Sequence, residues 1–213
     1  MADRPVPGPS DDAPASLRAE QVAQTRAALV GAGRELFGTK GFAATSVDDI
    51  ARTARVTTGA LYHHFPNKAA VFEAVFEQVH ADMLTATAEA VAAVAPGDPV
   101  AQMAAAFGVF LDQALESETQ RIIITDGPAV LGLARFVELD ERYALDAAVA
   151  FLDQANAAGT FVIEDPPMLA RLLFGAVTRA GLLIASSADP VATRDAVAAT
   201  FPGLLRGFAP PPG

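Results

Sequence analysis

Apolar residues recur every three or four positions along most of the chain, which is the spacing of α-helices that bury one face. In the first of these patterns, from Leu17 to Gly38, the apolar face carries Val22, Leu29 and Phe37. The predicted helices span residues 17–38, 46–54, 58–65, 67–94, 100–115, 119–134, 136–158, 167–187 and 190–208. We therefore expect an all-α protein.

Proline and glycine mark the ends of these helices. Pro66 ends the third helix, because the residue before a proline disfavours helical geometry, and Ala95–Pro99 separates the fourth helix from the fifth. Gly127 and Pro128 are expected to kink or split the sixth helix. Phe161–Ile163 is apolar enough for a short strand, but it is too isolated to form a sheet.

The composition excludes several kinds of site. The chain has no cysteine and three histidines, so disulfides and thiolate sites are excluded and a metal site has little to build on. We expect no metal and no cofactor. The Pro-rich start lacks the basic residues and apolar run of a signal peptide, and the nearest candidate for a membrane span, Ala180–Ala185, is far too short. A cytoplasmic protein without a membrane segment is therefore expected.

The net charge of −10 is unevenly distributed along the chain. Residues 17–68 carry seven basic and four acidic side chains, a net charge of +3, whereas residues 69–213 carry seven basic and eighteen acidic ones, a net charge of −11. A phosphate-binding face needs only local positive potential. Only the segment up to Lys68 is therefore suited to face nucleic acid.

The second and third predicted helices, joined by a tight turn, have the layout of a helix-turn-helix, in which the later helix enters the DNA major groove. Its small apolar core is expected from Val47, Ile50, Ala51, Leu61 and Phe65. Gly59 would let the first turn of the recognition helix come close to the bases. Thr57 and Thr58 add hydroxyls at the N-terminus of that helix, and Tyr62 and His63 add hydrogen-bond donors on its exposed side.

Two segments, FAATSVDDIA at residues 42–51 and VTTGALYHHFPNK at residues 56–68, resemble the two halves of the DNA-binding signature of the TetR family of transcriptional regulators. The segment AGRELFG at residues 32–38 fits the first helix of that family. The resemblance implies that bases or phosphates are contacted by Thr45, Ser46, Thr57, Thr58, Gly59, Tyr62, His63 and Lys68. From the residues alone, Thr45 or Ser46 could equally be an ordinary helix N-cap, and Tyr62 a core aromatic.

The resemblance also implies a division of the chain into four parts. These are a disordered Pro-rich tail (1–16), a helix-turn-helix DNA-binding domain (17–66), a helical effector-binding and dimerisation domain (67–208) and a frayed tail (209–213). The candidate effector-pocket residues are Met83, Phe107, Phe110, Arg121, Asp126 and Arg179. Arg179 would either bind an anionic effector or pair with Asp126, and we favour the pairing.

Residues 168–184 and 191–208 form two predicted helices with broad apolar faces. Gly175 and Gly181 would let another helix approach closely. Packing of both helices on their copies would make a two-fold, four-helix interface, although packing within one chain explains the same pattern.

We expect a homodimeric regulator, a repressor, that binds a near-palindromic operator in double-stranded DNA. An unknown small-molecule effector would tilt the fourth helix and release the DNA. No nucleophile–base set or Gly-x-Ser-x-Gly turn indicates an enzyme. Two other classes stay open, namely a sequence-independent architectural DNA-binding protein and a small-molecule-binding or enzymatic domain with a vestigial motif.

Overall fold

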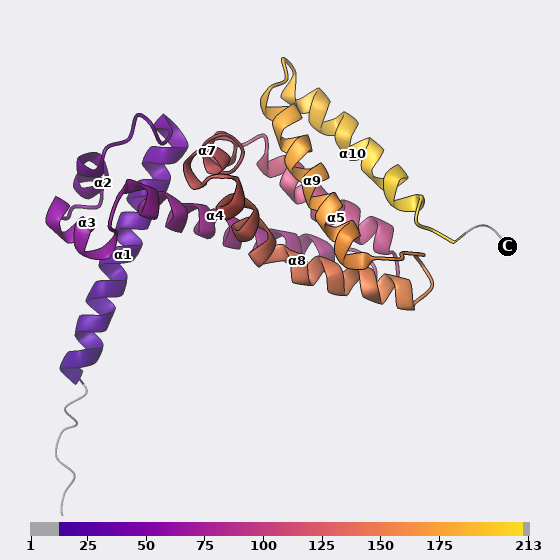
Figure 1. Ribbon diagram of the computed structural model, residues 1–213, viewed down its shortest axis with the longest axis horizontal. Helices are drawn as coiled ribbons and strands as arrows, with labels where there is room; N and C mark the ends of the chain where they lie inside the picture. Colours follow the sequence, from indigo (N-terminus) through magenta and orange to yellow (C-terminus); the bar gives the residue numbers. More distant parts are fainter. Residues whose placement is uncertain (1–12, 211–213) are drawn as a thin grey trace, which may run out of the picture.

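Two long helices organise the molecule. α1 (Ala13–Lys40) crosses a small N-terminal unit, and α4 (Lys68–Ala92) runs from that unit into a larger helical body (Figure 1). The computed structural model describes residues 13–210, and no strand occurs among them. The other elements are α2 (Val47–Thr53), α3 (Thr58–His64), α5 (Pro99–Gln113), α6 (Ser117–Thr119), the π-helical segment η1 (Gln120–Asp126), α7 (Gly127–Leu131), α8 (Leu133–Ala157), α9 (Pro166–Ala185) and α10 (Pro190–Arg206). The predicted all-α fold is confirmed.

The helix ends agree with the sequence pattern to within a few residues, except at the N-terminus. α1 begins at Ala13, so residues 13–16 are helical and not part of a disordered tail. Residues 1–12 and 211–213, which make up the rest of the two predicted tails, lie outside the described residues. Residues 161–163 form no strand. Instead, the Asn156 amide donates to the Ile163 carbonyl and accepts from the Ile163 N–H, both at 3.0 Å.

The N-terminal unit is held by a tightly packed apolar core between α1, α2, α3 and the start of α4. Ile50, Leu61 and Phe72 have no exposed surface. The rings of Phe37 and Phe72 meet edge to face with centroids 5.3 Å apart, an arrangement that aromatic pairs favour. The expected helix-turn-helix core residues are buried, apart from Val47, which is half-buried.

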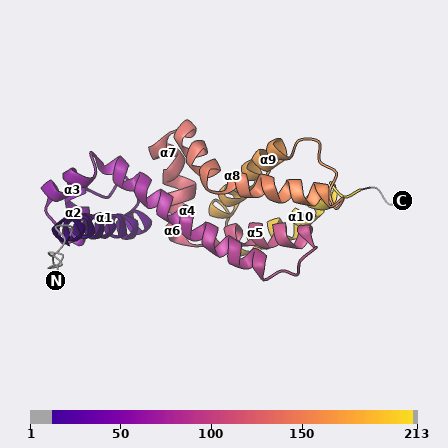
Figure 2. The same cartoon turned by 90° about the horizontal axis from the view of Figure 1, so that it is seen from below.

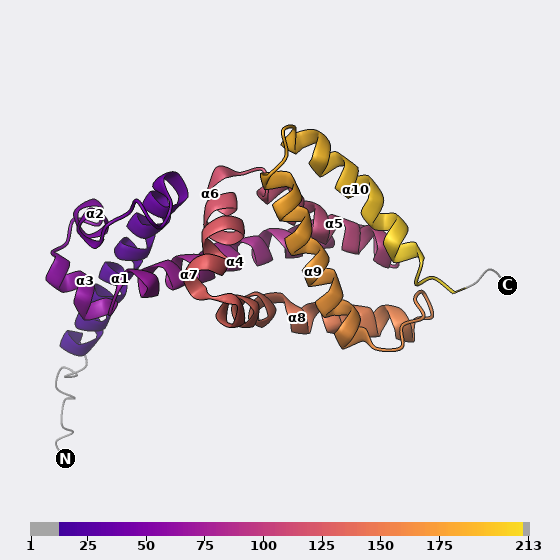
Figure 3. The ribbon, with the colours of Figure 1, turned by 45° about the horizontal axis from the view of Figure 1, so that its top comes forward.

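The larger body is a helical bundle. Seen from below, α4 and α5 lie along one side and α8 and α9 along the other (Figure 2). α10 packs against α5 and α9, and the view in Figure 3 shows α6 and α7 between the N-terminal unit and the bundle. This arrangement places the loops and short helices of the middle of the chain next to the DNA-binding motif.

The sixth predicted helix is interrupted, as expected, at Gly127 and Pro128. A Cβ on Gly127 would lie 2.9 Å from the carbonyl oxygen of Ile122 and 3.0 Å from the Phe76 ring, so only glycine fits there. The turns before it are π-helical, and Gly132, with φ +76°, separates α7 from α8. Because π-helical turns are rare and cluster at functional sites, η1 is a candidate for a functional role.

Candidate DNA interface and ligand cavity

α2 and α3 are each capped by the side chains that the sequence suggests. The Ser46 hydroxyl accepts from Asp49 N at 3.0 Å, and the Asp49 carboxylate accepts in return from Ser46 N, which is a capping box. Hydrogen bonds from the Ser46 hydroxyl and backbone hold the pKa of Asp49 below its ordinary value. Thr57 caps α3 by accepting from Ala60 N at 3.1 Å. Both helices therefore begin at fixed residues.

The outer surface of α3 is open to solvent. Thr57, Gly59, Tyr62 and His63 are exposed, and a Cβ at Gly59 would meet only the Thr57 hydroxyl, at 3.9 Å. Tyr62 is 53% exposed, so it is not a core aromatic. The Thr58 hydroxyl donates to Asp48 Oδ1 at 2.9 Å and so ties α3 to α2. Four of the eight predicted DNA contacts thus lie together on one accessible face, with Thr58 and the exposed cap Ser46 beside them.

Two of the predicted DNA contacts are engaged inside the protein, which corrects that expectation. Thr45 is 2% exposed, and its hydroxyl donates to the Gly41 carbonyl at 2.8 Å. Lys68 Nζ donates to the carbonyls of Phe42 and Thr45 at 2.7 and 2.8 Å, and it lies 4.0 Å from the centre of the Phe42 ring. Both side chains hold the α1–α2 turn in place, because its backbone carbonyls would otherwise lack partners.

Positive charge near α2 and α3 is supplied by other residues. Lys40, Arg52 and Arg55 are exposed, although Arg52 also pairs with Asp49. Arg55 has φ +58°, a left-handed conformation that is uncommon for a residue other than glycine, in the turn between the two helices. The positively charged surface is therefore small.

The N-terminal unit is joined to the body by long-range polar contacts. Asp126, the last residue of η1, accepts a hydrogen bond from Phe42 N at 2.7 Å. Arg34 of α1 pairs with both Glu118 of α6 and Asp82 of α4. Although burial opposes the charge of Arg34, the hydrogen bonds to Asp82 and Glu118 raise its pKa. No local sequence pattern predicts these contacts, since their partners are 48 to 84 positions apart.

A cavity of about 1070 Å³ lies within the body. Its walls are contributed by α4, α5, η1, α7, α8, α9 and α10. Three of the six predicted pocket residues, Met83, Phe107 and Phe110, line it, together with Phe136, Phe151, Phe174 and Phe201. A cavity of this size with mostly apolar walls is typical of a small-molecule site.

The three charged residues predicted for the pocket lie elsewhere. Asp126 faces the Phe42 backbone, and the Arg121 side chain approaches Gly41 in the same turn. Arg179 is exposed on α9, and no ion pair joins it to Asp126 among the described residues. For Arg121 and Asp126 the expectation was wrong because the helical pattern alone does not show that η1 turns their side chains toward the N-terminal unit.

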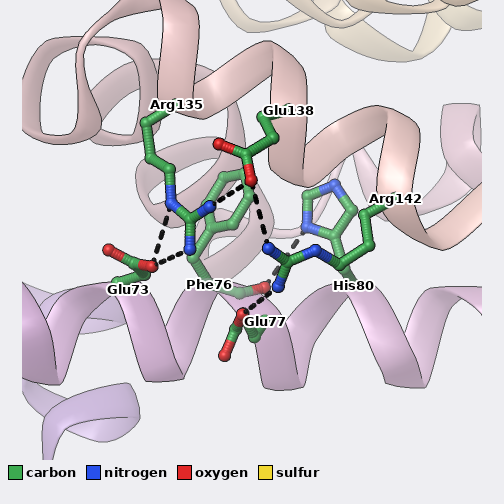
Figure 4. A network of polar contacts seen from close by, with 7 residues as sticks. All are labelled: Glu73, Phe76, Glu77, His80, Arg135, Glu138 and Arg142. Carbon is green, nitrogen blue, oxygen red and sulfur yellow. Dashed lines mark hydrogen bonds and ion pairs between the residues drawn. The ribbon is translucent and has the colours of Figure 1, made fainter.

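A network of ion pairs fixes α4 against α8 beside the cavity (Figure 4). Arg135 bonds Glu73 and Glu138, and Arg142 bonds Glu77 and Glu138. Hydrogen bonds to Arg135 lower the pKa of Glu138. One turn beyond Glu77 along α4 lies a histidine that lines the cavity.

That histidine, His80, is buried. Its Nδ1 lies 3.2 Å from the Phe76 carbonyl, and its Nε2 lies 3.2 Å from Asp140 Oδ1. The ring also packs on Phe76, with centroids 4.4 Å apart. Both His80 and Asp140 line the cavity. Among residues 13–210, no group of three potential metal-ligating side chains is found.

The surface of α9 is unusually apolar. By length and hydropathy, this helix is the one within the described chain that could span a membrane, and only 22% of its apolar window is buried. The length of this apolar segment was underestimated from the sequence, because Arg171 and Arg179 interrupt its apolar residues. The large exposed apolar residues on α9 and α10 are Met168, Leu172, Leu182, Leu183, Val191 and Leu204. Gly175 faces open space, whereas a Cβ on Gly181 would meet Ile124 and Phe110 within the chain, both at 3.0 Å.

A short helix-turn-helix unit followed by a helical body with a large cavity defines a class of DNA-binding regulators with a ligand-binding domain. Comparison with known proteins gives the family. The description "Bacterial regulatory proteins, tetR family" matches residues 29–75, and "Tetracyclin repressor-like, C-terminal domain" matches residues 100–208. The chain belongs to the TetR family.

Individual relatives agree with this assignment. A crystal structure of a TetR-family transcriptional regulator from Pectobacterium atrosepticum is 32% identical, with a TM-score of 0.79, over 91% of this chain and 98% of that one. RolR, crystallised in complex with the ligand resorcinol, is 22% identical with a TM-score of 0.71 over 91% and 97% of the two chains, and shares the fold.

Among curated proteins, the transcriptional regulator TtgR of Pseudomonas putida is 36% identical over 106 residues, which are 48% of this chain and 49% of TtgR. CymR, from the same species, is 31% identical over 57% of this chain and 62% of CymR. The chain therefore spans about half the length of the curated relatives it matches.

Proposed function

We propose that this protein is a dimeric transcriptional repressor that binds an operator through α2 and α3 and releases it when a small molecule fills the cavity. The observation that carries the proposal is the exposure of Thr57, Gly59, Tyr62 and His63 on α3, which is capped by Thr57, and no helix of residues 13–210 packs over these four residues. We further propose that the protein acts in the cytoplasm and is not an enzyme.

The DNA face is small and modestly charged. Hydroxyls, the exposed N-terminus of α3 and a tyrosine can fix the register on phosphates and base edges. Only a few exposed cations lie near them, so counterion release contributes less than in a strongly basic protein. The affinity for DNA should therefore depend on a few specific contacts to bases and phosphates, and each protomer of the dimer should make the same set.

The exposed apolar faces of α9 and α10 support dimerisation. Exposed apolar surface of this extent marks an interaction site, and a second copy of the chain would cover both helices symmetrically. Leu172 is 65% exposed at the centre of α9. By sedimentation, Leu172→Glu should be monomeric at micromolar concentration. Leu133→Glu, which changes a residue 74% exposed on α8, should remain dimeric. A monomeric wild-type protein would refute this step.

The contact between η1 and the α1–α2 turn supports a route from cavity to DNA. Ile123, Ile124 and Thr125 line the cavity, and the next residue, Asp126, holds Phe42 N. A ligand that displaces the wall at η1 would move the turn that precedes α2. This route adds to the expected tilt of α4, whose Lys68 holds the same turn.

Selection of genomic DNA fragments by the intact protein, followed by sequencing, tests the function. We expect a few near-palindromic sites, with the two half-sites about 34–36 Å apart or slightly more. An architectural protein would instead enrich fragments without a shared sequence. Loss of Tyr62 and Thr57 side chains should abolish selection. If the motif were vestigial, these substitutions would change nothing, because no selection would occur with the wild-type protein.

A further inference from the structure

Within the described part of the chain, the cavity in the body has no lysine or arginine side chain that could balance an anion, and its one histidine, His80, already faces Asp140. Arg135 and Arg142, the two arginines drawn in the network of Figure 4, are engaged by Glu73, Glu77 and Glu138. Moving a carboxylate or phosphate from water into such a site without a partner is very unfavourable. The cavity is therefore unsuited to anionic ligands.

The apolar walls are rich in aromatic rings. Phe107 and Phe201 stack with centroids 3.8 Å apart, and Phe110, Phe136, Phe151 and Phe174 line the same space. Met83 and Met103 add flexible thioethers that adapt to the shape of a ligand. Walls of this kind favour a flat, ring-bearing molecule, which can stack or pack edge-on.

Three polar side chains of the cavity, those of Thr87, Thr178 and Asp140, offer hydrogen-bond acceptors, and Gln102 and Thr125 also line it. The hydroxyl of Thr87 donates to the Met83 carbonyl at 2.8 Å, and that of Thr178 donates to the Phe174 carbonyl at 3.1 Å. Each hydroxyl has one hydrogen, so toward the cavity both oxygens offer lone pairs.

The Asp140 carboxylate adds the third acceptor. Its Oδ1 meets His80 Nε2, and its second oxygen can accept from a ligand. On the other side of the ring, His80 Nδ1 lies 3.2 Å from the Phe76 carbonyl, so both ring nitrogens face acceptors within the protein. His80 therefore orients Asp140 and has little donor capacity left for a ligand.

We infer that the ligand of this cavity is an uncharged, ring-bearing molecule with at least one hydroxyl or N–H donor, which is held by Thr87, Thr178 and Asp140. This inference rests on the proposed function for its regulatory meaning, but ligand binding itself is measured without DNA. Neither alternative for Arg179, an anionic effector or a pair with Asp126, is part of this site, because Arg179 is exposed and does not line the cavity.

Three probes that share one ring system test the inference with the intact protein. These are 4-phenylphenol, biphenyl and biphenyl-4-carboxylate, titrated by calorimetry. The phenol should bind tightest. Biphenyl should bind about 3- to 10-fold more weakly, because it lacks the hydrogen bond. The carboxylate should bind at least about 100-fold more weakly than the phenol.

A matched pair of variants locates the donor–acceptor contact. Thr178→Val removes the acceptor at nearly constant shape, and it should weaken the phenol about 3- to 10-fold while leaving biphenyl unchanged. Thr200→Val is the control, because Thr200 is exposed on α10 and its hydroxyl also donates to a carbonyl of its own helix. Retained biphenyl binding shows that the variant cavity is folded.

Two results would overturn the inference. One is binding of the carboxylate at least as tight as that of the phenol, and the other is equal binding of phenol and biphenyl. Failure of the proposed function gives a different result. In that case the phenol binds as expected but leaves the affinity for the selected DNA unchanged.

Discussion

The N-terminal unit and the body differ most in how their interiors are filled. In the N-terminal unit, formed by α1, α2, α3 and the start of α4, Ile50, Leu61 and Phe72 are completely buried, and the rings of Phe37 and Phe72 pack on one another. In the body, helices from α4 to α10 surround a cavity of about 1070 Å³. A dense core holds the exposed residues of α3 in one geometry, whereas a hollow core can change shape when it is filled. Under the proposed function, the densely packed region recognises DNA and the hollow region responds to a ligand.

The largest expected effect tests this difference in packing directly. Phe72→Ala should destabilise the protein by about 3–5 kcal/mol, because it opens a hole in a filled core. Phe151→Ala should cost about 1 kcal/mol, since its ring faces a cavity that already exists and fewer contacts are lost. Urea unfolding of both variants provides the measurement. Equal losses would show that the body is as tightly packed as the N-terminal unit.

The link between the two regions gives the next largest effect. Asp126→Ala leaves Phe42 N without its acceptor and should cost about 1–3 kcal/mol. It should also reduce the change in DNA affinity that a cavity ligand produces. Asp153→Ala, an exposed acid on α8, serves as the control for loss of negative charge. Full ligand response in Asp126→Ala would place the coupling in α4 alone.

The cap of α2 should have a smaller effect on stability. Ser46→Ala should cost about 1 kcal/mol, as removal of a helix N-cap does elsewhere. It should also change how the stability of the fold depends on pH in acid, because Ser46 holds the pKa of Asp49 below its ordinary value. The folded-state pKa lies below the unfolded value, so this stabilisation is present above the unfolded pKa and is lost as pH falls through the folded pKa.

Thermal unfolding between pH 2 and pH 6 measures that contribution. The wild-type protein should lose more stability over this range than Ser46→Ala does. Identical acid profiles of the two proteins would show that the capping box does not act through Asp49.

The turn between α2 and α3 should give the smallest change. Arg55 has φ +58°, and glycine adopts this conformation without the steric cost of a Cβ. Arg55→Gly should therefore raise stability by up to about 1 kcal/mol, measured by urea unfolding. It should also weaken DNA binding slightly, because an exposed cation is lost. A destabilised Arg55→Gly variant would mean that the Arg55 side chain makes contacts that matter more than the backbone.

The two regions also differ in how far they could be predicted from sequence. In the N-terminal unit, a hydroxyl cap before α2 and the buried Leu61 follow from patterns within a few residues of each other. The structure selects Ser46 over Thr45 as the cap of α2 and buries Leu61. Thr45 and Lys68 were assigned to DNA by resemblance. The structure places them against the turn at Phe42, because packing decides which polar residue reaches solvent.

In the body, helical periodicity predicted the helices and three apolar cavity residues, but not the direction of charged side chains. Asp126 and Arg121 lie on the π-helical segment η1, where the residue spacing around the helix departs from the 3.6-residue repeat. Asp140, one of the proposed ligand contacts, and His80, which orients it, are 60 positions apart. No local pattern joins such partners, so the cavity chemistry required the structure.

The most direct test of DNA binding by α3 uses Gly59. A Cβ added there meets no described atom closer than the Thr57 hydroxyl at 3.9 Å, and Gly59 is exposed, so Gly59→Leu should fold with unchanged or slightly raised thermal stability. Gly31→Leu is the matched control, because Gly31 is an exposed residue of α1 and a Cβ added there has no neighbouring atom within 4 Å. If the first turn of α3 lies against DNA, gel-shift affinity of Gly59→Leu for a selected fragment should fall at least about 100-fold, equivalent to about 3 kcal/mol. The Gly31→Leu variant should bind like the wild type. Wild-type affinity in folded Gly59→Leu would contradict the account.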